Sequence, residues 1–251
     1  MDIKTKLNNV LFPFIKIIKG KYKFTFDNKS YEYFIHKYSW NTERVVEIPI
    51  ILDYISRCKM NYCKGYCGNI QSEYCSPDAS TFIPRKFKIL EFGNVLQQFV
   101  PISWDVLDKY SKGERVIHED IVDFKPKEKY DLIVSISTLE HVGFNEDVEV
   151  IGHGADKIEQ NKTTEALNNI KENCLSLNGK LIFTIPLGYN SFLDKKLLGQ
   201  KLGFDKLTFM KRLTKNNEWA ETSFLERNIY GFPFNNANYI CVCEYDNTNN
   251  I

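Results

Sequence analysis

The spacing of apolar residues changes along the chain and divides it into two stretches. In the first, aromatic residues alternate with polar ones over residues 21–26 and 30–38, on either side of Asp27-Asn28, a pattern typical of a β-hairpin. Residues 42–55 follow, in which apolar side chains recur at helical spacing: Val45, Val46, Ile50 and Tyr54. They predict an amphipathic helix that Pro49 bends or splits.

From residue 86 onward, short apolar runs alternate with helical or turn segments. Seven runs are typical of strands: residues 87–92, 102–108, 115–120, 130–137, 180–186, 206–213 and 238–245. Between the fourth and fifth runs, residues 163–177 place four apolar side chains on one helical face: Ala166, Leu167, Ile170 and Cys174. Asn178-Gly179 is expected to end this helix.

Strands that alternate with crossover segments predict an α/β fold with a mostly parallel sheet, covered by helices on both faces. We expect seven strands, with the last one inserted antiparallel and with residues 87–92 and 130–137 as central neighbours. An N-terminal extension, residues 1–42, would carry a short apolar helix and the hairpin, and residues 43–251 would form the main domain.

Polar residues gather where the predicted strands end. Glu91 and Gly93 close the first strand, and Asp108 closes the second. Asp120 closes the third, and residues 137–141, Ser-Thr-Leu-Glu-His, follow the fourth. In open α/β sheets, ligands bind at the carboxyl ends of the strands. The sequence therefore predicts one binding site built from these four strand ends.

This order of motifs resembles that of class I S-adenosylmethionine-dependent methyltransferases, over about residues 43–251. The resemblance lies in "ILEFGN", "VLDKY", "IHEDI" and "STLEHVG" at the first four strands and in "NGKLIFTIP" at the fifth. It implies a Rossmann-like sheet, S-adenosyl-L-methionine as the cofactor and methyl transfer as the activity. The first turn departs from the family pattern, since it has one glycine where two or three are usual, and it leaves room for only a reduced first helix.

The resemblance implies a role for each strand end in holding the cofactor. Asp108 would accept the two ribose hydroxyls, because one carboxylate can accept two vicinal donors. Asp120 would accept the adenine amino group, with the Ile121 amide facing the ring. Each of these acids has an alternative role as a loop acid or a helix cap.

The methionine end of the cofactor would lie over the first turn and the fourth strand. Gly93 lets the backbone approach closely, and Asn94 tolerates a left-handed conformation. Glu91 suits the cationic sulfonium electrostatically, although it can also cap the next turn. Ser137 completes this set of cofactor-binding candidates.

Glu140 and His141 are the candidates for catalysis, because they follow the fourth strand directly. A neutral imidazole can take the proton of a hydroxyl acceptor, whereas an amine acceptor needs little help from a base. Tyr189 lies just beyond the fifth strand, where substrate loops are expected. The alternatives are a solvated acid for Glu140 and a structural role for His141.

Composition narrows the class of protein. The formal net charge is +1, which argues against a broad nucleic-acid-binding face. No apolar run approaches the length of about 20 residues that a membrane helix needs. The start of the chain lacks the pattern of a secretory signal, so a cytoplasmic location is expected.

Seven cysteines are present, and four of them cluster as Cys58, Cys63, Cys67 and Cys75. Their spacing lacks the tight pairs of a structural zinc site, so free thiols in a loop over residues 58–84 are predicted, with no metal. A metal or cluster site is the alternative. Cys241 and Cys243 alternate within the last strand and are expected to be core thiols on one face.

Three functions remain open on this evidence. The first is a methyltransferase for a small-molecule acceptor, or for a sugar or glycan precursor; the glycan suggestion comes only from a resemblance of "ERVVEIPI" and "LEFGNVL" to methyltransferases of glycan biosynthesis. The second is an RNA or protein methyltransferase, against which the neutral charge and the missing Asn/Asp-Pro-Pro-Tyr/Phe motif count. The third is a non-catalytic nucleotide-binding or scaffold protein on the same fold.

Overall fold

The computed structural model describes residues 22–67, 86–143, 161–223 and 229–249. The predicted N-terminal helix, Cys75 and residues 144–160 lie outside the described residues. Among the described helices, none combines the length and apolar character needed to span a bilayer.

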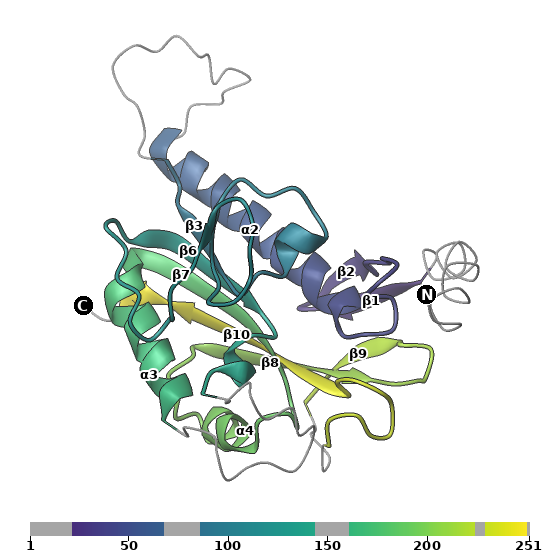
Figure 1. The fold of residues 1–251 in the computed structure, drawn as a ribbon. Helices are drawn as coiled ribbons and strands as arrows, with labels where there is room; N and C mark the ends of the chain where they lie inside the picture. Colours follow the sequence, from purple (N-terminus) through teal and green to yellow (C-terminus); the bar gives the residue numbers. More distant parts are fainter. Residues whose placement is uncertain (1–21, 68–85, 144–160, 224–228, 250–251) are drawn as a thin grey trace.

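The centre of the molecule is one twisted sheet with the strand order β5-β4-β3-β6-β7-β10-β8-β9 (Figure 1). The strands are β3 (Ile89–Phe92), β4 (Asp105–Leu107), β5 (Val116–Ile117), β6 (Tyr130–Ile136), β7 (Leu175–Pro186), β8 (Lys206–Arg212), β9 (Trp219–Thr222) and β10 (Tyr239–Asp246). The first five in this order run parallel, and β10 is inserted antiparallel between β7 and β8. This confirms the predicted sheet, with β3 and β6 as central neighbours, and adds β9 as an eighth strand.

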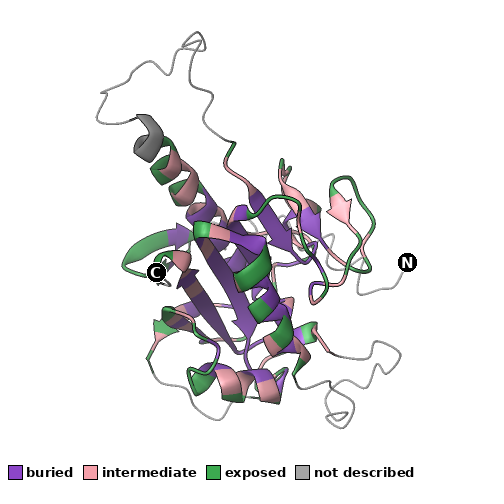
Figure 2. Ribbon diagram, turned by 90° about the vertical axis from the view of Figure 1, so that its left-hand side faces the viewer, coloured by how far each residue is buried: buried purple, intermediate pink, exposed green. Residues whose placement is uncertain are grey.

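Helices cover both faces of the sheet, as predicted. Helix α2 (Arg44–Cys67) packs on one face, in an apolar cluster with β6, β7 and β10. On the other face lie α3 (Lys162–Asn169), the π-helix η4 (Ile170–Cys174) and α4 (Ser191–Leu198). Short 3₁₀ helices complete the structure: η1 (Leu96–Gln98), η2 (Leu139–His141) and η5 (Asn247–Asn249). In Figure 2 the strands between these layers are almost entirely buried.

The predicted hairpin is present as β1 (Lys23–Phe26) and β2 (Lys29–Glu32). Asp27 and Asn28 form its turn with φ angles of 50° and 61°, the left-handed pair that a tight hairpin turn requires. Phe24, Phe26 and Tyr31 are buried in the same apolar cluster as α2. The hairpin therefore shares the core of the main sheet.

Pro49 lies inside α2 without splitting it. Because proline has no amide hydrogen, the carbonyl of Val45 loses its usual helical donor. The amide of Phe34 donates to this carbonyl instead, at 2.9 Å. The helix thus continues through Pro49, and its free carbonyl ties it to the segment after the hairpin.

Three local predictions need correction or confirmation. Helix α2 continues to Cys67, so Cys58 and Cys63 lie on a helix and not in the predicted loop. The helix predicted over residues 163–177 ends at Cys174, because β7 begins at Leu175 and contains Asn178-Gly179 as an irregularity. Cys241 and Cys243 are buried on one face of β10, with their Sγ atoms 3.6 Å apart, as predicted.

Candidate functional site

The turn after β3 is tightly constructed around Gly93. Its φ of +87° is the left-handed conformation that favours glycine, and a Cβ at this position would lie 2.1 Å from Thr138 Oγ1. The ends of β3 and β6 therefore meet at this glycine. The following residues form η1, a single turn, which agrees with the reduced first helix expected from the sequence.

Glu91 organises this turn from within. Its side chain is completely buried, and Oε1 accepts the amides of Val95 at 2.8 Å and Leu96 at 2.5 Å. Trp104 Nε1 approaches Oε2 at 3.4 Å. Burial raises the pKa of Glu91 to about 7, although these three hydrogen bonds oppose the shift. Glu91 thus caps the start of η1, since its side chain accepts the amides of Val95 and Leu96.

Asp108 joins the second strand end to the first. Its Oδ2 accepts the Asn94 amide at 2.9 Å, and its Oδ1 accepts the amides of Tyr110 at 2.9 Å and Ser111 at 2.7 Å. Burial opposes ionisation of the carboxyl group, but the amides of Ser111, Asn94 and Tyr110 outweigh it and lower its pKa. Asp108 is thus a half-buried carboxylate beside the Gly93 turn.

Asp120 lies beyond β5 and is paired with lysines. Its Oδ2 is 3.2 Å from Lys109 Nζ and 3.9 Å from Lys162 Nζ, and its Oδ1 accepts the Val122 amide at 3.1 Å. Burial opposes the lowering of its pKa, which the Val122 amide and Lys109 bring about. Ile121 is buried, and its carbonyl accepts from Asn169 Nδ2 at 2.7 Å.

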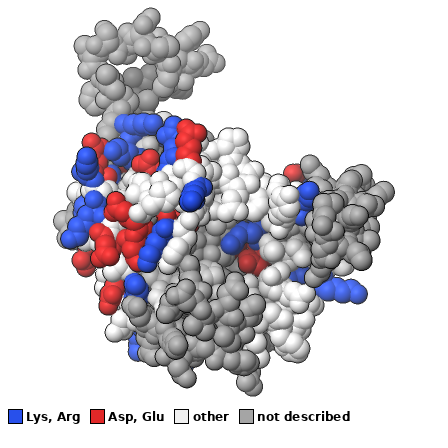
Figure 3. All heavy atoms as spheres, in the orientation of Figure 1, with Lys and Arg blue, Asp and Glu red and all other residues white. Residues whose placement is uncertain are grey.

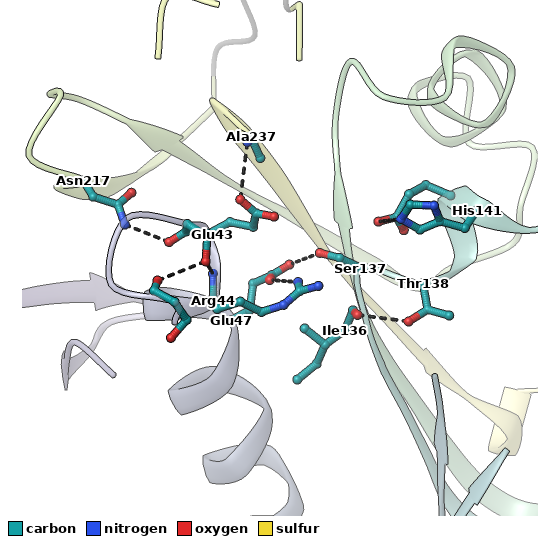
Figure 4. A network of polar contacts seen from close by, with 12 residues as sticks. Glu43, Arg44, Glu47, Ile136, Ser137, Thr138, His141, Asn217 and Ala237 are labelled. Atoms are coloured by element: carbon teal, nitrogen blue, oxygen red, sulfur yellow. Dashed lines mark hydrogen bonds and ion pairs between the residues drawn. The ribbon is translucent and has the colours of Figure 1, made fainter. Parts of the chain in front are cut away.

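A second polar group surrounds the end of β6 (Figure 4). Ser137 has a φ of 41°, and its hydroxyl donates to Glu47 Oε1 at 2.7 Å. Glu47 comes from α2 and is fully buried, and its Oε2 pairs with Arg44 Nη1 at 2.5 Å. Glu43, at the start of the same helix, accepts the Ala237 amide at 3.3 Å. The Ser137 side chain is thus engaged with α2.

Glu140 is the most unusual carboxyl group of the site. It is 1% exposed, and its Oε2 has no hydrogen-bond partner among the described residues. Burial raises its pKa well above the usual range; its own amide and Arg44 oppose this, while the charges of Glu47 and Glu43 add to it. Its carbonyl accepts from Asn190 Nδ2 at 3.0 Å, which fixes the backbone of η2.

Three aromatic rings, those of His141, Tyr189 and Tyr230, lie in a row beside Glu140. His141 Nε2 is 3.7 Å from Glu140 Oε1, and the His141 ring is 4.7 Å from that of Tyr189. The ring of Tyr230 is 5.2 Å from Tyr189. The His141 side chain is 53% exposed yet loses part of its hydration, and this loss together with the Arg44 charge lowers its pKa. The predicted residues Ser137, Glu140, His141 and Tyr189 therefore lie together.

The sequence reasoning missed four contributors to this second group, namely Glu43, Arg44, Glu47 and Tyr230. A signal for the two acids was present, because positions 43 and 47 are one helical turn apart and continue the stripe of Ile50 and Tyr54, all buried. An acid on an apolar stripe indicates a buried charge that needs a partner. No pattern in the neighbouring sequence marks Tyr230 as a site residue.

Among the described residues on the face drawn in Figure 3, acidic and basic side chains are interspersed. This distribution agrees with the formal net charge of +1. The described residues on that face form no broad basic region of the kind that nucleic-acid-binding proteins present.

No model of a known protein family matches the chain, and no curated protein matches it in sequence. Several solved structures of S-adenosylmethionine-dependent methyltransferases are similar to it in fold. The N-methyltransferase NodS of Bradyrhizobium japonicum, in complex with S-adenosyl-L-homocysteine, has a TM-score of 0.42 and 10% identity over 84% of this chain and 93% of its own. A possible histamine N-methyltransferase of Thermotoga maritima has a TM-score of 0.39 and 11% identity over 79% and 96%. A TehB-like methyltransferase of Corynebacterium glutamicum has a TM-score of 0.35 and 19% identity over 79% and 99%. The assignment of the fold itself rests on the strand order.

Proposed function

We propose that this protein is an S-adenosylmethionine-dependent methyltransferase that acts on a small-molecule acceptor. The observation that carries the proposal is the meeting of Glu91, Asp108 and Thr138 around the Gly93 turn, on a mostly parallel sheet with one inserted antiparallel strand. Ligands of open α/β sheets bind at this edge. We further propose a cytoplasmic location, as expected from the sequence.

The residues at the turn suit the methionine and ribose parts of the cofactor. Asn94 is buried, and its Oδ1 has no hydrogen-bond partner among the described residues, so it can accept from a ligand. Asp108 is ionised and half-exposed, so it can accept ribose hydroxyls with the lone pairs that its three amide donors leave. The bound cofactor would supply an electrophilic methyl group.

The adenine end is less well matched to the role inferred for Asp120. Its carboxylate already accepts one amide and lies near two lysines. An adenine amino group would have to share this carboxylate with Lys109. We therefore assign Asp120 chiefly to the electrostatic fixation of its loop, and propose that the Ile121 amide faces the ring.

The acceptor would lie at the second polar group, where Glu140 and His141 follow β6 and Tyr189 follows β7. We propose Glu140 and His141 as the acid–base pair and Tyr189 as a substrate contact. A sugar or glycan precursor remains the acceptor hypothesis that the sequence resemblance supports, and labelled cofactor incubated with sugar-nucleotide and lipid-linked pools tests it.

Calorimetry with S-adenosylmethionine and S-adenosylhomocysteine on the purified protein tests the proposal. We expect both to bind with a stoichiometry of about one, and ATP to bind at least about tenfold more weakly, because it lacks the methionine group that the Gly93 turn receives. Binding of ATP alone would favour the nucleotide-binding scaffold instead. Failure of both cofactor forms to bind a folded protein would remove the proposed function.

A further inference from the structure

We propose that the acceptor is an amine, held as an ammonium ion by Glu140 among the rings of His141, Tyr189 and Tyr230. The identity of the reaction rests on the proposed function above. The binding of an ammonium ion rests on the charges, distances and burial of this second polar group, and it can be tested without any methyl transfer.

The first argument is the balance of charge. Glu43, Glu47 and Glu140 are exposed by only 6%, 0% and 1%, and buried carboxylates need cations or donors. Glu47 pairs directly with Arg44 and accepts from Ser137. Glu43 accepts the Ala237 amide, and the charge of Arg44 opposes the rise in its pKa that burial causes. For Glu140, no ion pair with a lysine or arginine exists among the described residues.

The second argument is the unmet acceptor. Glu140 Oε2 is buried and without a partner in the described part of the chain, while its Oε1 lies 3.7 Å from His141 Nε2. An ammonium group brings up to three N–H donors and one positive charge to such an oxygen. It therefore satisfies the hydrogen bond and the charge of Glu140 at once.

The third argument is the aromatic surround. Tyr189 lies between the other two rings, at 4.7 Å from His141 and 5.2 Å from Tyr230. Glu140 Oε1 lies 3.7 Å from His141 Nε2, so the carboxyl group lies beside the first of these rings. Aromatic rings attract alkylammonium ions through their negative faces. A carboxyl group at one end of a row of three contacting rings suits such an ion.

A neutral hydroxyl acceptor fits the same place less well. It can donate one hydrogen bond to Oε2, but it brings no charge to balance Glu140, whose neighbours Glu43 and Glu47 are also acidic. Deprotonation of the carboxyl group would then leave an uncompensated buried charge. The same geometry thus discriminates an amine from an alcohol of equal shape.

The bound ammonium ion must lose a proton before its nitrogen can act as a nucleophile. In this step one N–H bond breaks, its electron pair stays on nitrogen, and an O–H bond forms at Glu140 Oε2. The carboxyl group then returns to the carboxylate by giving up this proton, and His141 Nε2, half-exposed and 3.7 Å from Oε1, accepts it and releases it to solvent. This assigns proton acceptance to Glu140 and proton release to His141.

A matched pair of probes tests the inference, namely benzylamine, an ammonium ion at pH 7, and benzyl alcohol, its neutral counterpart. Calorimetry is carried out with and without saturating S-adenosylhomocysteine. We expect benzylamine to bind at least about tenfold more tightly than the alcohol, as one charge-assisted hydrogen bond implies. Glu140→Gln should abolish this preference, whereas Glu165→Gln, at an exposed site on α3, should retain it.

Tyr189 gives a second and milder variant. Tyr189→Leu should weaken benzylamine binding by about two- to fivefold through loss of the cation–π contact, and Tyr189→Phe should keep most of it. Equal affinity of the two probes for the wild-type protein, or binding of neither, overturns the inference. If S-adenosylhomocysteine does not bind while benzylamine is still preferred, the proposed function fails and the ammonium site stands. If it binds and the preference is absent, only the ammonium site fails.

Discussion

The carboxyl groups of Asp108 and Asp120 lie at the ends of β4 and β5, and those of Glu43 and Glu140 lie further along the same edge of the sheet, near the start of α2. The first pair is half-exposed, accepts backbone amides and has lowered pKa values. The second pair is buried and has raised pKa values, chiefly because burial disfavours the charged form. Residues of one chemical type thus have opposite tendencies to ionise within one site.

The difference shows how one fold can separate binding from chemistry. Acids that stay ionised suit the recognition of neutral hydroxyl donors, and acids whose pKa is raised by burial suit proton exchange with a bound ligand near neutral pH. The residues around the Gly93 turn and the second polar group meet at Gly93 and Thr138. A variant in one of these two parts of the site can therefore be made while the properties of the other part are measured. Five variants exploit this, in order of decreasing effect.

The largest effect is expected at His141. Because an acceptor bound as an ammonium ion must first lose a proton through Glu140 and His141, His141→Ala should lower turnover by about 10²–10⁴-fold, the usual value of acid–base assistance, and change cofactor affinity little. Since the pKa of His141 is lowered, the wild-type rate should rise with pH through a midpoint below about 6.5, the ordinary imidazole value. Labelled methyl transfer to an accepted amine measures both. His118→Ala, at an exposed histidine, is the control, and near-normal turnover of His141→Ala would make the residue structural.

The second largest effect is expected from removing Glu47, which connects α2 to the end of β6. Glu47→Ala leaves the Arg44 guanidinium without its direct partner and the Ser137 hydroxyl without its acceptor. We expect a loss of about 3–5 kcal/mol in the free energy of unfolding, the usual result of removing one member of a buried pair. Urea unfolding measures it against Glu32→Ala, an exposed control on β2. A loss below about 1 kcal/mol would show that the contact contributes little.

The raised pKa of Glu91, at the Gly93 turn, should make the free energy of unfolding depend on pH. Its folded-state pKa of about 7 lies above the ordinary 4.5, so its contribution to stability is complete below pH 4.5 and is lost as the pH rises through 7. Two to three pKa units correspond to about 3 kcal/mol. The stability difference between wild type and Glu91→Gln should change by this amount between pH 4.5 and 8 in urea unfolding. A constant difference would contradict the raised pKa.

Asp108 should affect affinity without affecting chemistry. Asp108→Ala is expected to weaken S-adenosylhomocysteine binding by about 1.5–3 kcal/mol, the range for a hydrogen bond to a charged group. Asp108→Asn, which keeps an oxygen for the loop amides, separates loss of charge from loss of loop structure. Asp123→Ala, at an exposed neighbour, controls for net charge. An unchanged dissociation constant in a folded variant would remove Asp108 from the ribose role.

The smallest effect is expected at Asp120. Its pairing with Lys109 is largely exposed, since the lysine side chain is 49% exposed, and such pairs contribute about 0–1 kcal/mol. Asp120→Asn should therefore weaken cofactor binding by less than about 1 kcal/mol in the same calorimetry. A loss as large as that of Asp108→Ala would restore the direct adenine contact.

Local patterns predicted the features that depend on neighbouring residues. The hairpin turn followed from Asp27-Asn28, and the mostly parallel sheet followed from the alternation of apolar runs with crossover segments. The meeting of the Ser137 hydroxyl with Glu47 was beyond such reasoning, because the two residues are separated by 90 positions and belong to different layers. Strand β9 has too few apolar residues to be distinguished from a loop in the sequence. Among the proposed site residues, those on strand ends could thus be inferred, and those supplied by α2 could not.

The hydrogen bond from Phe34 to Val45 also makes one amide a reporter of motion at the site. The Phe34 amide donates to the Val45 carbonyl, which has no helical donor because Pro49 lacks an amide hydrogen. This amide therefore exchanges with deuterium only when the segment after the hairpin detaches from α2. That segment leads directly into Glu43 and Arg44. Deuterium uptake at the Phe34 amide therefore measures how often the chain beside Glu43 and Glu47 opens. Slower uptake in the presence of a ligand measures how far binding suppresses this opening.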